Sequence, residues 1–247
     1  MIRPEKRTLL KIPVAGILSL TINAATLVGR KSDMPPFEML VYRLFGSMVS
    51  DSKEMFLIIV QNIIFIVLFS ALFSGYISAH FRYSCVYVFS RLKSRRRWFA
   101  ERALELMITA ALYAAVYIGV TLMICCASSN APFLREHLGS LLLLYLCALL
   151  ITVNITLGIN LLSLRFGSTV SFFVVQAALA GFIYLALNTA VSAPCAWLNP
   201  LSCILILDAP TPYLPILGSV IILILLFFGG MAYVDRYDIA LFDPEIN

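Results

Sequence analysis

The chain has 247 residues, of which 61% are hydrophobic and 13% charged, and its mean hydropathy is +0.95. Because soluble globular domains carry about 25% charged residues, this composition excludes a soluble domain and indicates an integral membrane protein. The net charge of +5 does not indicate nucleic-acid binding. The basic residues lie beside long apolar runs, where retention of positive charge on the cytoplasmic side accounts for them.

Six apolar runs follow one another along the chain. Each has roughly the 20 residues that a helix needs to cross about 30 Å of hydrocarbon. Within lipid, helices satisfy the backbone of such continuous runs. The sequence therefore predicts an all-α membrane protein with one transmembrane domain over residues 1–247. Its predicted spans are residues 12–28, 55–79, 106–126, 138–162, 169–193 and 216–234.

The basic residues predict the orientation of these spans. With both termini in the cytoplasm, the inner segments hold 13 of the 18 Lys and Arg residues and the outer segments hold five. The inverted topology would place the 13 outside, contrary to the positive-inside rule. We therefore expect six spans with both termini inside.

The outer segment between the first two spans contains a predicted amphipathic helix. Glu38 and Arg43 interrupt it and it is short, so we expect it to lie along the outer interface rather than to cross. Its apolar residues recur at steps of three and four. They are Phe37, Leu40, Val41, Leu44, Phe45, Met48 and Val49.

The segment from His80 to Glu105, between the second and third spans, is strongly basic. It holds seven cationic residues, against only Glu101 and Glu105, and we expect its helix to run directly into the third span. The aromatic pair within it, Trp98 and Phe99, favours docking of a cytoplasmic partner. The alternative is that the arginines only anchor the inner interface and bind anionic lipid head groups. The cationic residues are Arg82, Arg91, Lys93, Arg95, Arg96, Arg97 and Arg102.

A second informative segment runs from Ala193 to Pro210 on the outer side. It is apolar but broken by prolines, which favours a re-entrant element with Trp197 near the interface. The alternative is an outer loop with a short helix. Cys195 and Cys203 could form a disulfide if the exterior is oxidising, or remain free thiols, because their spacing does not establish the geometry.

Chemistry by the chain alone is disfavoured. It lacks the Gly-x-x-x-x-Gly-Lys-Ser/Thr phosphate loop, and we expect no metal site because His80 and His137 fall on opposite sides of the membrane. No predicted span has Asp or Glu near its middle, where ion-coupled transporters carry them. The polar residues within spans either hydrogen-bond to neighbouring helices or line a substrate path. They are Asn154, Asn160, Gln176 and Asn188.

Three motifs in this order resemble permease subunits of type-2-class ATP-binding-cassette exporters. Arg91–Phe99 (RLKSRRRWF) is similar to their cytoplasmic loop, Leu198–Ser202 (LNPLS) to their outer re-entrant element, and Asp235–Ile239 (DRYDI) to the tail after the last span. The six-span plan matches over essentially the whole chain. The small size is most similar to permeases that export bacteriocin-type peptides, or confer immunity to them.

This resemblance implies a permease of the bacterial plasma membrane that forms the path for an amphipathic peptide or lipid-like substrate. It implies two partners: a second permease copy or paralogue, and a separate ATPase subunit that holds ATP and Mg²⁺. A cleft on the ATPase would receive a coupling helix of about residues 82–102. The N-terminal tail is too short for the amphipathic entry helix of many relatives. The alternative is a structural or sensory subunit that transports nothing.

The resemblance also assigns residues. The outer re-entrant element would include Trp197, Asn199 and Pro200. Contacts with the ATPase would come from Arg82, Arg91, Arg95, Arg96, Arg97, Trp98, Phe99 and Glu101. Within this set Trp98 and Phe99 would form a packed anchor. At helical spacing, Glu101 and Glu105 would pair with Arg97 and Arg102.

Overall fold

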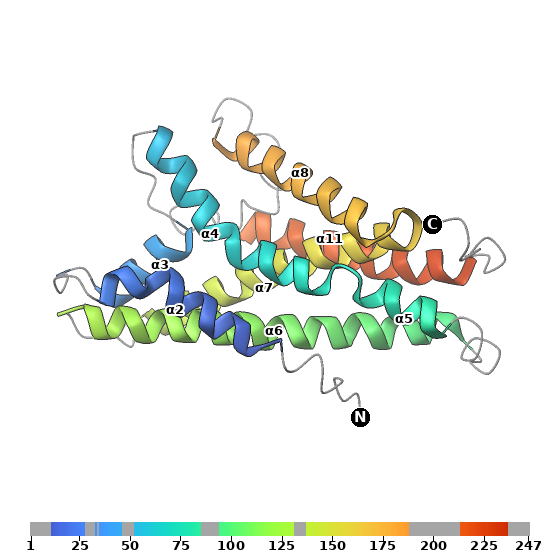
Figure 1. The fold of residues 1–247 in the computed structure, drawn as a ribbon, viewed down its shortest axis with the longest axis horizontal. Helices are drawn as coiled ribbons and strands as arrows, with labels where there is room; N and C mark the ends of the chain where they lie inside the picture. Colours follow the sequence, from blue (N-terminus) through green and yellow to red (C-terminus); the bar gives the residue numbers. More distant parts are fainter. Residues whose placement is uncertain are drawn as a thin grey trace.

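The structure, a computed structural model, describes residues 11–27, 33, 35–45, 52–84, 94–130, 137–187 and 213–236. Side chains are described for residues 11–23, 33, 35–41, 63–81, 94–130, 137–182 and 216–236. Within these ranges the regular elements are all α-helices, as predicted, and most follow the long axis of the molecule (Figure 1). The helices are α2 (Pro13–Leu27), α3 (Pro36–Phe45), α4 (Ser52–Phe73), α5 (Tyr76–Ser84), α6 (Arg95–Ser128), α7 (Leu138–Phe166), α8 (Ser168–Leu187) and α11 (Tyr213–Arg236).

Among the described residues, four segments have the length and apolar composition to cross a membrane: Ile63–Phe81, Arg95–Ser128, Leu138–Phe166 and Ile216–Arg236. Two shorter apolar segments, Pro13–Asn23 in α2 and Ser168–Phe182 in α8, correspond to the remaining predicted spans. The chain is therefore built like a multi-pass α-helical membrane protein. Six crossings, cytoplasmic termini and the re-entrant segment remain predictions.

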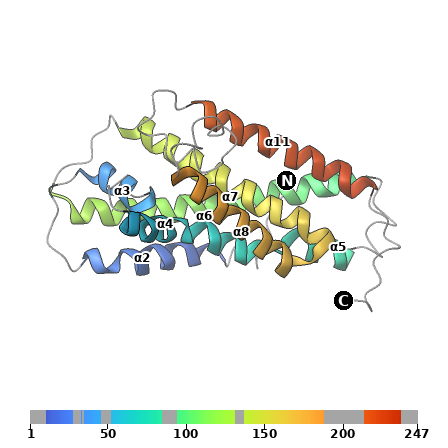
Figure 2. The same ribbon diagram turned by 90° about the horizontal axis from the view of Figure 1, so that it is seen from above.

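Helix α7 is the centre of the bundle, with 67% of its span buried inside the chain, whereas only 17% of the α11 span is buried. It packs against α4, α5, α6, α8 and α11 (Figure 2). Aromatic rings fill the space between α4 and α6, where Phe65 lies 4.9 Å from Tyr117 and Phe69 lies 4.9 Å from Tyr113, measured between ring centroids. These four rings are almost completely buried.

Helices α2 and α6 pack along a seam of small residues. A Cβ atom at Gly16 would lie 3.4 Å from a methyl carbon of Val116, an ordinary van der Waals distance, so the two helices lie close together here. Further along the seam, the Ser19 and Thr121 hydroxyl oxygens are 2.8 Å apart. Because Thr121 donates to the carbonyl of Tyr117, Ser19 donates to Thr121.

The second predicted span, residues 55–79, is not one continuous helix. It breaks at Ser74 and Gly75, between α4 and α5. An unbroken helix would bond the Ile77 N–H to the Phe73 carbonyl. Here the Asn160 side chain inserts between these two groups, accepting from Ile77 N–H and donating to the Phe73 carbonyl, each at 2.8 Å. A side chain within the backbone ladder is a recognised cause of a helix break.

The other boundaries agree with expectation or differ by a few residues. Helix α6 begins at Arg95, so the helix of the basic segment does run directly into the third span, as predicted. The connection between the fourth and fifth predicted spans, residues 163–168, is shorter than the span boundaries imply, because α7 continues to Phe166. Gly167 alone separates α7 from α8, at φ +79°, a conformation that favours glycine. Arg165 consequently belongs to the last turn of α7.

The predicted amphipathic helix is present as α3, and residues 46–49 of the predicted stripe lie outside the described residues. Met39 and Leu40 are buried, and α3 packs against α4 and α6. Phe37 stacks on His137 with ring centroids 4.9 Å apart. This helix therefore closes one end of the bundle by packing against it.

Candidate functional site

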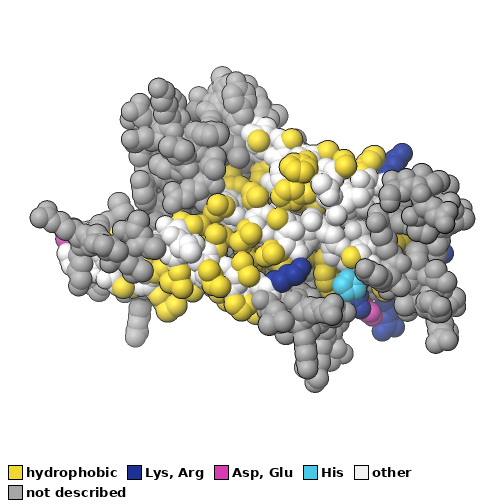
Figure 3. Space-filling view, viewed as in Figure 1, with side chains coloured by type: hydrophobic (Ala, Val, Ile, Leu, Met, Phe, Trp, Pro, Cys, Tyr) yellow, Lys and Arg dark blue, Asp and Glu magenta, His cyan; other side chains and the backbone are white. Residues whose placement is uncertain are grey.

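The charged side chains that the structure describes are divided unequally between the two ends of the bundle. Asp33 and Glu38 lie at the end near α3. The end at which α6 begins, here called the basic end, carries six arginines, and most of the Lys and Arg atoms visible in Figure 3 lie toward it. They are Arg95, Arg96, Arg97, Arg102, Arg165 and Arg236.

The first turn of α6 is unusual for a helix N-terminus. Ser94 caps the helix, and its hydroxyl oxygen accepts from the Arg97 N–H at 3.4 Å. The turn then holds Arg95, Arg96 and Arg97, with no acidic residue. The positive end of the helix dipole favours acidic residues by about 0.3–1 kcal/mol each, so three arginines here oppose the dipole. Local rules of this kind are broken most often at functional sites.

Three ion pairs organise the basic end. Arg97 bonds Glu101 at 3.1 Å, and Arg102 bonds Glu105 at 2.7 Å, which confirms both predicted pairs along α6. The third pair is between helices, because Arg96 donates from Nε and Nη2 to one carboxylate oxygen of Asp235 at 3.0 and 2.7 Å. The beginning of α6 is therefore attached to the last turn of α11.

These pairs differ greatly in exposure. The Arg97 side chain is 83% exposed, whereas the Glu105 side chain is 3% exposed. Arg96 is also largely exposed. The surface available to a partner is therefore the outward side of the first turn, and the Arg102–Glu105 pair belongs to the packing between α6 and its neighbours.

The prediction that Trp98 and Phe99 form an anchor for a partner is wrong, because both side chains point into the bundle. Trp98 is 5% exposed and Phe99 is fully buried. Trp98 packs edge-on against Phe81 of α5 at 5.7 Å, and Phe99 packs against Phe227 of α11 at 6.3 Å, both between ring centroids. The two rings join α6 to its own neighbours, so they are unavailable as a surface anchor.

A sequence signal for this burial exists. The buried residues of α6 include Phe99, Ala103, Leu106, Ala110 and Tyr113, which recur at alternating steps of four and three. That period describes one face of a helix. Phe99 is the first member of the buried stripe that continues through the third span. The prediction did not use this stripe because it treated the basic segment and the third span separately.

The polar residues within the spans hydrogen-bond between helices, as one of the two alternatives predicts. Asn160 bonds α4 and α5 at the helix break, and the Asn154 amide donates to the Ser219 carbonyl of α11 at 3.0 Å. The Gln176 amide donates to the Ser70 hydroxyl at 2.8 Å. Asn188 lies outside the described residues.

Besides Asn160, a lysine that the sequence did not single out contacts the α4–α5 break. Lys11 donates to the Leu72 carbonyl at 2.7 Å, and its ammonium lies 4.7 Å from the centroid of the Phe73 ring. Burial lowers the pKa of Lys11. The sequence offers no local sign of this contact, since Lys11 and Leu72 are joined only by the tertiary fold.

The two histidines occupy opposite ends, as predicted. The ring of His80 in α5 packs on Tyr76, whereas His137 stacks on Phe37 of α3. Among the described residues, no group of three or more His, Cys, Asp or Glu side chains could hold a metal ion. Arg91, Trp197, Asn199, Pro200, Cys195, Cys203 and the side chain of Arg82 lie outside the described part of the chain.

Comparison of the chain with known protein families, with characterised proteins and with solved structures finds no match.

Proposed function

We propose that the chain is the permease subunit of an ATP-driven exporter, with a separate ATPase subunit that docks on the basic end. The feature that supports this proposal is the arginine surface of the first turn of α6, defined by Arg95, Arg96 and Arg97, of which Arg96 and Arg97 are exposed. Three cations at the positive end of a helix dipole reduce stability, and an acidic partner surface would offset that cost.

The continuity of this surface with a membrane-length helix supports the same proposal. Helix α6 continues without a break from Arg95 to Ser128, which includes a whole apolar span. A displacement of the first turn by a partner would therefore move the span as one rigid element. The Arg96–Asp235 pair and the Phe99–Phe227 contact would carry the same displacement to α11.

We place the substrate path between two copies of the chain. The candidates for lining a path were Asn154, Asn160 and Gln176. Each of them forms hydrogen bonds between helices of one copy. The outward faces of α8 and α11 are apolar and exposed, with Phe173 and Phe228 each at least 60% exposed. A path bordered by such faces would suit an amphipathic or lipid-like substrate.

Co-purification tests the docking proposal. The tagged full-length chain is extracted from the membranes of its own cells, and mass spectrometry counts subunits that contain a phosphate-binding loop. Replacing Arg95, Arg96 and Arg97 together with Gln should lower ATPase recovery at least about tenfold, because several charge-assisted contacts disappear at once. Trp98 is left intact, since its substitution would disturb the fold.

Arg165→Gln is the control, because Arg165 also lies at the basic end but on α7. It should leave ATPase recovery unchanged. If the triple variant recovers as much ATPase as the parent chain, the arginines of α6 bind lipid instead. If the parent chain retains other membrane proteins but never a nucleotide-hydrolysing subunit, the chain is a structural or sensory subunit and the proposal is wrong.

A further inference from the structure

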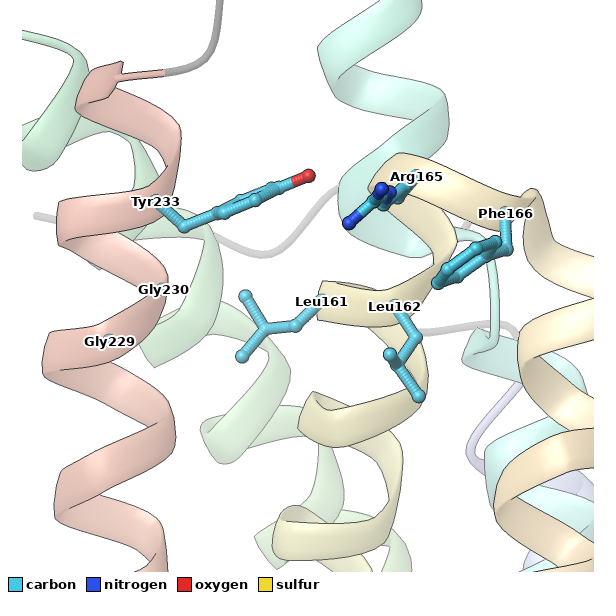
Figure 4. A pocket seen from close by; sticks show the side chains of 7 residues that line it. All are labelled: Leu161, Leu162, Arg165, Phe166, Gly229, Gly230 and Tyr233. Carbon is cyan, nitrogen blue, oxygen red and sulfur yellow. The ribbon is translucent and has the colours of Figure 1, made fainter.

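A groove lies between the last turns of α7 and α11 at the basic end. It encloses about 300 Å³, at the lower limit of the roughly 300–1,000 Å³ that small-molecule sites occupy. Figure 4 shows side chains of α7 on one side, and Gly229, Gly230 and the Tyr233 side chain of α11 on the other. Its lining residues are Leu161, Leu162, Arg165, Phe166, Gly229, Gly230 and Tyr233.

Two adjacent glycines have different roles in this groove. A Cβ atom at Gly230 would lie 2.4 Å from a ring carbon of Phe99 and 2.8 Å from a methyl carbon of Leu161, so Gly230 sets the close packing of α11. A Cβ atom at Gly229 would have nothing within 4 Å. Position 229 therefore borders open space, into which a larger side chain would project.

The polar groups of the groove gather at its rim. Arg165 lies in the last turn of α7, and the Tyr233 hydroxyl points across the groove toward its guanidinium (Figure 4). Among the described residues no carboxylate lies within 4 Å of Arg165. Its guanidinium carbon lies 5.4 Å from the centroid of the Phe166 ring. The rim therefore offers the positive charge of Arg165 above an otherwise apolar cavity.

The position of the groove selects one class of occupant. It is formed by two of the helices that are long and apolar enough to cross a membrane, and it opens on the poorly buried α11. Such a surface faces acyl chains, and its cationic rim complements a phosphate head group. Basic pockets between transmembrane helices bind anionic lipid head groups in this way.

We propose that this groove binds one anionic glycerophospholipid. An acyl chain occupies the space above Gly229, and the lipid phosphate accepts hydrogen bonds from Arg165. The site is separate from the arginine surface of α6 and does not depend on docking of an ATPase.

Native mass spectrometry of the purified full-length chain tests this site. The probes are dioleoyl phosphatidylglycerol, which is anionic, and dioleoyl phosphatidylcholine, which is zwitterionic. The parent chain should retain one phosphatidylglycerol in preference to phosphatidylcholine. Arg165→Gln should lower phosphatidylglycerol retention about tenfold, because a charge-assisted contact is lost. Gly229→Leu should fill the groove and remove both lipids.

Two matched variants control for general effects. Gly181→Leu introduces the same side chain at an exposed glycine of α8, where a Cβ atom likewise meets nothing within 4 Å. Arg97→Gln removes one exposed charge from α6. Both should retain phosphatidylglycerol like the parent. Circular dichroism and a single monodisperse gel-filtration peak show whether Gly229→Leu is folded, and Arg165→Gln tests the rim without altering the packing.

Several results would overturn the proposal. Equal retention of the two lipids by the parent, or unchanged phosphatidylglycerol retention in Arg165→Gln or in folded Gly229→Leu, would exclude an anionic lipid in this groove. Displacement of phosphatidylglycerol by glycerol 3-phosphate alone would indicate a site for a soluble phosphate. Loss of a dimer, rather than of lipid, in Gly229→Leu would show that a second copy occupies the groove.

Discussion

Asn160 is the residue on which the local structure of the second span depends most directly. Replacing it with Ala should lower the free energy of unfolding by about 2–4 kcal/mol, because the Phe73 carbonyl and the Ile77 N–H both lose their partner in the bundle interior. The measurement is denaturation of the purified chain in mixed micelles, followed by circular dichroism.

Asn154→Ala is the matched control, since it removes the same atoms from the same helix. Asn154 donates one hydrogen bond to α11, so its loss should cost only about 1 kcal/mol. Equal costs for the two variants would mean that both are ordinary buried amides, and that Asn160 has no special part in the helix break.

At the residue scale, the sequence predicted contacts within one helix better than contacts between helices. The Arg97–Glu101 and Arg102–Glu105 pairs follow from helical spacing alone. Arg96–Asp235 joins residues 139 positions apart, so no spacing rule could find it. Trp98 was misplaced because three arginines precede it in the sequence, whereas its burial depends on Phe81 in another helix.

At the scale of elements, the packing of α11 on α6 and α7 depends on the two adjacent glycines. Gly230→Ala should lower the free energy of unfolding by about 1–3 kcal/mol, because its Cβ atom would overlap Phe99 and Leu161. Gly229→Ala should be neutral or stabilising by up to about 1 kcal/mol, since alanine favours the helix and the space is open. The same micelle denaturation measures both.

The comparison between these glycines is informative because they differ in surroundings and hardly at all in sequence context. Phe99→Leu should reduce the cost of Gly230→Ala, because it removes the ring carbons that lie closest to the new Cβ atom. If Gly229→Ala lowered the free energy of unfolding more than Gly230→Ala, α11 would pack on α6 and α7 through the side that carries Gly229.

The helices themselves were largely predictable, and their interruptions were not. Apolar length placed each predicted span on a described helix. The break at Ser74 and Gly75 could not be inferred, because glycine is tolerated within helices of membrane proteins. The break depends on Asn160, which lies 83 positions after Ile77 and reaches it only in the folded bundle.

At the scale of the whole molecule, the sequence predicted that positive charge would be concentrated at one end, and the arginines whose side chains are described are gathered there. It could not predict that α7 is the centre of the bundle, because the apolar composition of α7 resembles that of the other spans. Which helix lies inside is decided by the matching of surfaces between helices. The groove between α7 and α11 was hidden for the same reason.

The orientation of the whole molecule can be tested with the two ends of α6. This helix has 34 residues and is about 51 Å long, so both its ends extend beyond about 30 Å of hydrocarbon. Arg97 and Asn130 are both exposed, at opposite ends. In intact cells, a membrane-impermeant maleimide should modify Asn130→Cys and should modify Arg97→Cys only after permeabilisation, because positive charge is retained in the cytoplasm. The parent chain, with its six natural cysteines, gives the background. The reverse labelling pattern would place the arginines of α6 outside the cell, where no ATPase could reach them.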